Sequence, residues 1–353
     1  MTATQINREE FLRALESVEP GLSKKPITEQ SDCLVFQNGR VHAFNDEVYC
    51  RAPSPLESFE GAVPAPKLLD ILRKVEQEEL EVSNANGQLI FTGQRGERFK
   101  VRVEAEILLP VEAIEKPKKT DWKPLHPEFG EALTVTGNCA SRDQSRFEAT
   151  CVHICPQWIE AFDDMRMCRW QLETGLKEPV LVRQSSLRQV PSLGMTHWCV
   201  TAGWLHFKNA TSGLLLSCRR YHEEFPDLEP VLKLIQGEPA QLPKGLGDAI
   251  ERAAVFSSEN PDANLVKVRL TPGKARVSGC GLSGEYSKPL SAKYAGEVAE
   301  FLVPPALLQD VIKRHSEVLI GTGKMWVNTG RAVFLTCLVV PDDEQAQANG
   351  GEQ

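Results

Sequence analysis

One twelve-residue segment near the start of this chain recurs near its end. The first copy reads Val63-Pro-Ala-Pro-Lys-Leu-Leu-Asp-Ile-Leu-Arg-Lys74, and the second, 240 residues later, reads Val303-Pro-Pro-Ala-Leu-Leu-Gln-Asp-Val-Ile-Lys-Arg314. Four of the twelve positions are identical and four more are conservative, with no gap. In a chain of 353 residues, this separation predicts three units of roughly 120 residues, the middle copy having diverged.

The two outer units share one order of elements, in which a helix and a hairpin are followed by a second helix and a second hairpin. In the first unit, apolar residues at helical spacing cover residues 8–18, and the dipeptides Asn38-Gly39 and Asn86-Gly87 mark two hairpin turns. The third unit repeats this order, with helices expected over residues 246–255 and 303–314. In the middle unit, the second helix is expected near residues 183–190, where Pro191 cuts it short.

These patterns predict three domains, at residues 1–115, 125–235 and 240–341, followed by a disordered tail at 342–353. The joins are rich in proline, and the tail is acidic and rich in Gly, Asn and Gln.

Composition narrows the class of protein. A hydrophobic fraction of 41% suffices for real cores, and the net charge of −8 excludes a chain that is basic overall. No apolar run approaches the roughly 20 residues needed to span a bilayer, and the polar N-terminus has no signal-peptide pattern. We therefore expect a cytosolic protein.

The ten cysteines are expected to be small buried hydrophobes rather than disulfide partners, because most, such as Cys33, Cys199, Cys218 and Cys337, lie in apolar strand-like runs. Cys151-Val-His-Ile-Cys155 is the one metal-like spacing. A zinc site would need a further ligand from a second motif. None is evident, so no metal is expected.

Nothing in the sequence favours an enzyme. It has no Gly-rich phosphate loop, no His-Glu-x-x-His motif and no nucleophile-elbow pattern, and its seven histidines are scattered.

The chain is thus predicted to have three units, and each unit contains a helix and a hairpin twice. This organisation resembles the bacterial-type DNA sliding clamp, the beta-subunit family of DNA polymerase III. Gly284-Glu-Tyr-Ser-Lys-Pro-Leu-Ser-Ala-Lys-Tyr-Ala-Gly296 is similar to the family's strand-and-turn signature. Phe225-Pro-Asp-Leu-Glu-Pro-Val231 is similar to its junction before the third domain. The resemblance covers residues 1 to about 340, and it rests on the order and spacing of motifs.

The resemblance implies an α+β fold of three clamp domains and a head-to-tail homodimer that closes into a ring. Such a ring encircles double-stranded DNA without reading sequence and tethers the replicative DNA polymerase. A clamp loader places it on DNA, and it has no catalytic activity and no cofactor. The setting would be the cytoplasm, near the nucleoid, of a bacterium or of a phage-infected host.

A sliding ring needs cations that face phosphates. Helices assigned to the channel carry Arg8, Arg13, Lys67, Arg188, Lys244 and Arg252 besides the DNA-contact candidates. The residues that the resemblance and the repeat assign to DNA contact are Lys24, Lys25, Arg73, Lys74, Arg142, Arg146, Phe147, Arg183, Lys313 and Arg314.

The resemblance also implies a groove for short peptide motifs of partner proteins, suited to Leu and Phe side chains. The matching residues are Asp163, Asp164, Met165, Arg166, Met167, Pro226, Val231, Cys337, Leu338 and Val339. The subunit interface is assigned to Phe99, Val255 and Phe256.

Two segments depart from the family pattern. Asp163-Asp-Met-Arg-Met167 replaces the usual Asp-Gly-His-Arg-Leu, and Cys337-Leu-Val339 replaces a C-terminal Met-Pro-Met. These departures are compatible with a divergent clamp, including one encoded by a phage, and with altered partner specificity. The alternatives are a clamp relative that serves as a binding platform without closing on DNA, and an enzyme.

Overall fold

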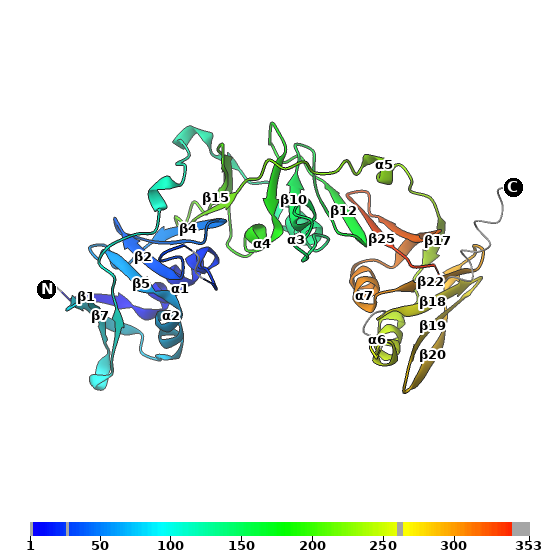
Figure 1. Cartoon of the computed structure of the whole chain (residues 1–353), viewed down its shortest axis with the longest axis horizontal. Coiled ribbons are helices and arrows are strands. Elements are labelled where there is room, and N and C mark those ends of the chain that lie inside the picture. Colours follow the sequence, from blue (N-terminus) through cyan, green and yellow to red (C-terminus); the bar gives the residue numbers. More distant parts are fainter. Residues whose placement is uncertain (1–2, 26–27, 260–263, 341–353) are drawn as a thin grey trace. The chain divides into compact units, whose positions relative to one another are not determined.

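The structure is a computed structural model that describes residues 3–25, 28–259 and 264–340 (Figure 1). The predicted tail at 342–353 lies outside the described residues. The chain divides into two compact units. Unit 1 comprises Met1–Gly137, Cys151–Gln157 and Leu172–Glu224, and unit 2 comprises Asn138–Thr150, Trp158–Gln171 and Phe225–Gln353. The division into three domains stays a prediction.

Among its described residues, unit 1 contains two antiparallel sheets, a strand pair and four α-helices. The four-stranded sheet has the order β1 (Thr4–Asn7), β6 (Glu79–Ala85), β7 (Gln88–Thr92) and β8 (Arg98–Arg102). The eight-stranded sheet has the order β5 (Gly61–Pro64), β2 (Cys33–Gln37), β3 (Arg40–Phe44), β4 (Val48–Pro53), β16 (Leu215–Arg219), β15 (Trp204–Lys208), β14 (His197–Val200) and β9 (Lys123–Pro124). Strand β10 (Cys151–Ile154) pairs with β13 (Val180–Arg183). The helices are α1 (Arg8–Val18), α2 (Ala65–Lys74), α3 (Phe129–Gly137) and α4 (Gln184–Leu187).

The described part of unit 2 contains two further runs of paired strands and three α-helices. The longer run has the order β11 (Trp158–Phe162), β12 (Arg166–Gln171), β25 (Ala332–Cys337), β24 (Lys324–Asn328), β23 (Glu317–Gly321), β17 (Glu238–Gln241) and β21 (Lys293–Tyr294). The four-stranded sheet has the order β20 (Gly284–Ser291), β19 (Lys274–Gly281), β18 (Val266–Thr271) and β22 (Ala299–Val303). The helices are α5 (Glu229–Leu232), α6 (Leu246–Ser257) and α7 (Pro305–Arg314).

Local sequence signals account for the turns and the first helix. Asn38 and Asn86 have φ of 53°, and the glycines that follow them have φ of 67° and 68°. Positive φ at both central residues is the type I′ pattern that Asn-Gly favours in hairpins. Helix α1 begins after Asn7, whose side chain accepts a hydrogen bond from the Glu10 N–H at 3.0 Å. Both hairpins and this helix match the sequence prediction.

The repeated segments form equivalent helices. Helices α2 and α7 each follow a proline with φ near −55°, Pro64 at −55° and Pro304 at −57°. In both helices the repeated leucine points into a core, since Leu68 is 0% and Leu308 is 1% exposed. Each packs against the helix that opens its repeat, α2 on α1 and α7 on α6 (Figure 1). The predicted duplication is therefore confirmed.

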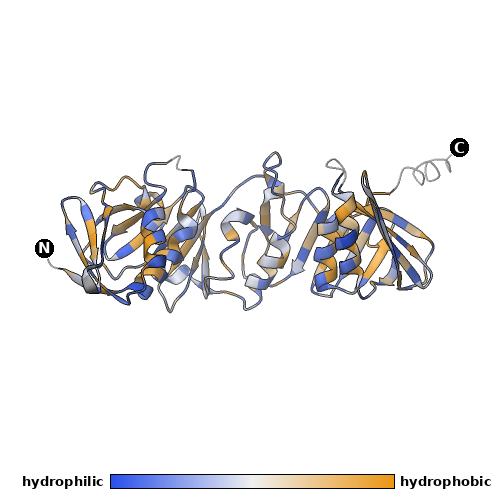
Figure 2. Cartoon of the chain, turned by 90° about the horizontal axis from the view of Figure 1, so that it is seen from below, coloured by the Kyte–Doolittle hydropathy of each residue, from blue (hydrophilic) through white to orange (hydrophobic). Residues whose placement is uncertain are grey.

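The helices have apolar and polar sides, so each can cover a sheet while it presents charges to solvent (Figure 2). Helix α1 buries Phe11, Leu15 and Val18. Among the described residues, no helix is both long and apolar enough to cross a membrane.

The middle of the chain departs most from the regular pattern. Helix α4 ends at Leu187, before Pro191, as expected from the lost backbone donor. Helix α3 was not predicted, because its sequence Phe-Gly-Glu-Ala-Leu-Thr-Val-Thr-Gly has weak helix formers and a glycine near each end.

The cysteines behave mainly as buried apolar residues. Eight of the ten are buried, Cys280 is exposed, and Cys337 is half-buried. All ten are free thiols. The His153 Nδ1 lies 3.5 Å from the Cys155 Sγ, while Cys151 is fully buried.

Candidate functional site

The C-terminal end of α2 carries one paired and one unpaired cation. The Arg73 guanidinium lies 2.9 Å from the Glu16 carboxylate and 2.9 Å from that of Glu19. These partners, chiefly through the hydrogen bond that Arg73 donates to Glu16, raise the pKa of Arg73. Lys74 is exposed and forms no ion pair with any described residue. At this end of α2, Lys74 is therefore the cation that is available to an external anion.

The C-terminal end of α7 has the same division of roles with the positions exchanged. Arg314 lies 3.2 Å from Asp310, one helical turn earlier. Lys313 is exposed, and its side chain has no ion pair within the described part of the chain. The C-terminal end of each repeat helix thus keeps one cation without an acidic partner among the described residues.

The four long helices are close to neutral as a group. Helices α1, α2, α6 and α7 together carry eight basic and seven acidic side chains, a difference of one positive charge. The basic residues predicted on α1 and α6, Arg8, Arg13 and Arg252, are offset by acids on the same helices. Positive charge is concentrated at the ends of α2 and α7.

The cations of the two predicted basic loops differ in whether they form ion pairs. Lys24, Lys25 and Arg142 are exposed and have no ion pair among the residues the structure describes. Arg146 lies 2.8 Å from Asp164 and 3.3 Å from Glu148, and its guanidinium sits 5.6 Å above the Phe162 ring. The loop therefore holds Arg146 against the protein. Phe147, its neighbour, is half-buried.

Arg183 is also engaged inside unit 1. Its Nε lies 3.3 Å from the Glu47 carboxylate, and its guanidinium lies 5.9 Å from the Tyr221 ring centre. Only 22% of its side chain is exposed. These contacts make Arg183 a structural cation in this conformation.

The apolar slot predicted for partner peptides is filled by the protein's own side chains. Met167 and Val231 share one cluster in unit 2 with Trp326, Leu335 and Phe225. Met167 is 3% and Trp326 only 1% exposed. Two of the predicted residues, Met167 and Val231, thus come together in a packed core rather than in an open groove.

Arg166 and Asp163 shape the turn that leads into β12. The Asp163 carboxylate accepts hydrogen bonds from the Met165 and Arg166 N–H groups at 2.9 and 2.8 Å, and from Arg166 Nε at 3.0 Å. Arg166 also lies 3.7 Å from Asp310 of α7. Because side chains alternate across a strand, Arg166 faces α7 while Met167 faces the apolar cluster.

The remaining groove candidates occupy different environments. Cys337 is half-buried, and its N–H donates to the Met165 carbonyl at 2.6 Å. Leu338 packs in a separate core with Met325. Val339 is 37% exposed, whereas Pro226 is half-buried. Cys337 and Met165 are therefore neighbours, whereas Leu338 belongs to a different core.

Two strands end their sheets with an open edge. In β8 of unit 1, Arg98, Lys100 and Arg102 are exposed, and the ring of Phe99 stacks on Phe91 at 4.5 Å. An open edge offers unpaired backbone N–H and C=O groups to another strand.

In unit 2, β20 is an edge strand beside the end of α6. Val255 is 65% exposed, and the half-buried Phe256 lies against Gly284. The sequence did not point to Leu282, which is 97% exposed at the turn before β20. An apolar patch this close to an open edge is typical of a protein contact.

Solved structures show which known fold this is. A DNA polymerase sliding clamp of Pseudomonas aeruginosa, crystallised with a ligand, is 16% identical; the match covers 97% of this chain and 100% of that one, with a TM-score of 0.79. The beta chain of DNA polymerase III from Streptococcus pneumoniae is 16% identical with the same coverage, with a TM-score of 0.82. The beta subunit from Thermotoga maritima is 15% identical, covering 96% of this chain and 99% of that one, with a TM-score of 0.83.

This chain has the sliding-clamp fold. The predicted α+β class and the predicted likeness to clamps are confirmed, and at this level of identity the likeness establishes the fold alone. No protein-family profile matches the chain, and no curated protein sequence matches it significantly.

This clamp fold contains an ion-pair triad, with Arg169 and Glu160 buried and Glu229 partly exposed, that sequence reasoning missed. Arg169 lies 2.7 Å from Glu160 and 2.6 Å from Glu229, and its guanidinium covers the Trp158 ring at 4.6 Å. Burial opposes the charge on Arg169, yet the two carboxylates raise its pKa. The triad fixes α5 beside the apolar cluster. Its members are 9 and 60 residues apart in sequence, so no local pattern could have revealed it.

Proposed function

We propose that two copies of this chain close head to tail into a ring around duplex DNA and act as a sliding clamp, or processivity factor. The observation that carries the proposal is the completeness of the match, since it spans 97% of this chain and 100% of the Pseudomonas aeruginosa clamp. All the parts of a clamp subunit therefore have counterparts here. The ring would have no catalytic activity of its own.

The open edges suggest how the ring closes. Strand β8 of one copy would pair with β20 of the other, and Phe99 would meet Val255 and Phe256. Six predicted domains from two copies would complete the circle, because a head-to-tail contact closes only at the right rotation per subunit. The ring would act in the cytoplasm, at the nucleoid.

The test of encirclement is topological. We expect the protein, once loaded on a nicked circular plasmid, to stay on the plasmid in roughly 0.5–1 M salt. Salt at this concentration disrupts phosphate contacts. Cutting the plasmid once should release it. Retention is measured by gel filtration before and after linearisation. Loss in high salt from the intact circle would contradict encirclement.

DNA contact is assigned first to Lys74 and Lys313, the cations without an ion pair among the described residues at the C-terminal ends of the two repeat helices. Replacing both with Glu should weaken binding to linear duplex about tenfold and reduce the salt dependence by roughly two phosphate contacts. Binding is measured by fluorescence anisotropy at several salt concentrations. Lys274→Glu, at an exposed position of β19, is the matched control. An equal loss in the control would show a general charge effect instead.

Partner proteins, including the replicative DNA polymerase and a clamp loader, would bind at the apolar cluster of unit 2. A Leu or Phe side chain can enter only if the segment carrying Phe225 and Val231 moves, because that segment packs on the cluster. A partner would therefore have to open this slot in order to bind in it.

A second candidate function is a clamp-fold binding platform that does not close on DNA. It is favoured by the engagement of Arg73, Arg146, Arg183 and Arg314 with acidic side chains. Such a protein would bind partners at the slot yet leave intact circular DNA at high salt.

A further inference from the structure

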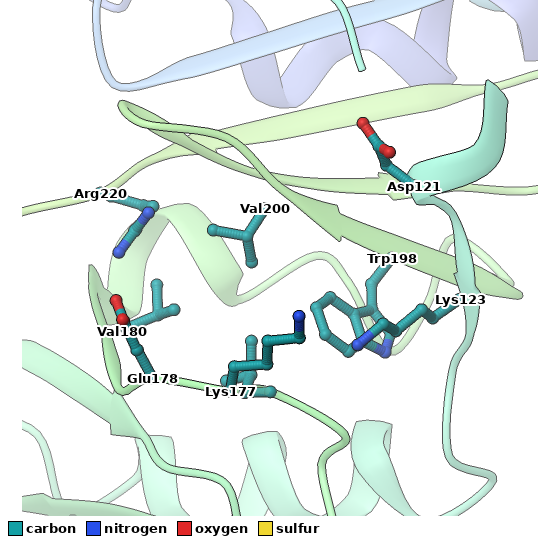
Figure 3. A pocket seen from close by; sticks show the side chains of 9 residues that line it. Asp121, Lys123, Lys177, Glu178, Val180, Trp198, Val200 and Arg220 are labelled. Atoms are coloured by element: carbon teal, nitrogen blue, oxygen red, sulfur yellow. The ribbon is translucent and has the colours of Figure 1, made fainter. Parts of the chain in front are cut away.

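A pocket of about 340 Å³ in unit 1 has no part in the proposed ring contacts or partner slot (Figure 3). Strands β13 and β14 and the segment before β13 form its walls. Its lining combines an aliphatic surface with cations, which is the composition of a site for an amphipathic anion.

Among the cations that line the pocket, Arg220 is partly buried and no carboxylate of the described residues contacts it. Its Nη1 donates to the Thr201 carbonyl at 2.7 Å, whereas its buried Nε makes no hydrogen bond to any described residue. Within the described part of the chain, no carboxylate lies within 4 Å of it. Burial lowers the pKa of Arg220, although Glu178 partly opposes this. A partly buried guanidinium without a carboxylate partner gains most from a carboxylate ligand.

Lys177 adds a second available cation. It is exposed, its amine extends toward the middle of the pocket, and it forms no ion pair within the described residues (Figure 3). The other lysine, Lys123, is already engaged, since its Nζ donates to the Gly175 carbonyl at 3.0 Å and lies 5.1 Å from the Trp198 ring centre.

The two acids of the pocket differ. Asp121 accepts hydrogen bonds from the Thr120 hydroxyl and the Lys118 N–H, both at 3.2 Å, so its carboxylate serves its own turn. Glu178 lies on the same side of the pocket as Arg220 and has no hydrogen bond among the described residues (Figure 3). A ligand anion would therefore compete with Glu178 for Arg220.

The apolar part of the pocket favours an aliphatic ligand over an aromatic one. Leu176 and Val200 are half-buried, and Val180 is 2% exposed. Trp198 is 5% exposed and Lys123 covers its ring, so its face is not open for stacking. We propose that this pocket binds an aliphatic carboxylate, with the carboxylate on Arg220 and Lys177 and the aliphatic part on Leu176, Val180 and Val200. Such a group could belong to a free small acid or to the C-terminal residue of a peptide.

The test uses the full chain with methyl-labelled valine and leucine. Titration with N-acetyl-L-leucine should shift the methyl signals of Val180 and Val200, with a Kd on the order of 1 mM for a ligand of this size. N-acetyl-L-leucinamide, which lacks the charge, should shift them at least tenfold more weakly. The peptide Gly-Gly-Leu with a free C-terminus identifies the source: tighter binding than N-acetyl-L-leucine indicates a chain end, and equal binding indicates a small acid.

Two substitutions should act in opposite directions. Lys177→Glu should weaken binding of N-acetyl-L-leucine about fivefold, and Glu178→Gln should tighten it about threefold by removing the competitor. Lys274→Glu, which does not line the pocket, should have no effect. Both residues are exposed and lack hydrogen bonds within the described chain, so folding should be preserved. Equal shifts with the amide, absence of shifts at tenfold higher ligand, or no effect of Glu178→Gln would overturn the proposal.

Discussion

The Phe256→Asp variant is expected to be a monomer at micromolar concentrations at which the parent chain is a dimer. Phe256 lies against Gly284 of the open edge strand β20, beside the exposed Val255. A carboxylate buried in an apolar contact without a partner costs several kcal/mol, so the dimer Kd should rise at least about 100-fold. Sedimentation equilibrium measures the mass directly.

Thr134→Asp is the control, because it adds the same charge at an exposed position of α3, which belongs to neither edge strand. It should leave the dimer intact. If Phe256→Asp stayed dimeric, the interface would lie elsewhere. A parent chain that is itself a monomer at these concentrations would instead favour the binding platform.

The second large effect is expected from Arg169→Met. This change leaves the Glu160 carboxylate, whose residue is 2% exposed, without the guanidinium that lies 2.7 Å away. Removing one member of a buried ion pair typically costs about 3–5 kcal/mol of stability. Urea unfolding followed by tryptophan fluorescence should show this loss. Adding Glu160→Leu should recover most of it, because the buried carboxylate is then gone.

The Glu229→Gln variant tests whether the triad restrains α5, separately from what the triad contributes to stability. The Glu229 side chain is 47% exposed, so its removal should cost less than about 1 kcal/mol. If the Arg169 contact restrains α5, this variant should bind a fluorescent peptide carrying Leu and Phe more tightly than the parent, by anisotropy. Unchanged binding would show that α5 does not control the slot.

Much of the fold could be predicted because its signals are local. The Asn-Gly turns require positive φ, and the proline-led repeat helices carry their starting signals and apolar spacing within a dozen residues. Helix α3 could not be predicted in the same way, because Thr134, Val135 and Thr136 are weak helix formers that only tertiary packing stabilises.

The candidate sites were less predictable because their properties depend on distant partners. Arg73 and Lys74 look equivalent in sequence, yet Glu16, 57 residues earlier, pairs with only the first. Met167 looks like the lining of an open slot, yet Trp326 and Phe225 pack around it. Pairing and burial between remote segments decide which residues remain available.

The charges of β8 also bear on the direction in which copies can join. Two β8 edges placed together would bring two sets of Arg98, Lys100 and Arg102 face to face, and like charges across a strand pair are destabilising. Strand β20 instead exposes Glu285, Ser287 and Pro289. Electrostatic repulsion thus disfavours pairing between two β8 edges, so a β8 edge is left to pair with an unlike edge such as β20.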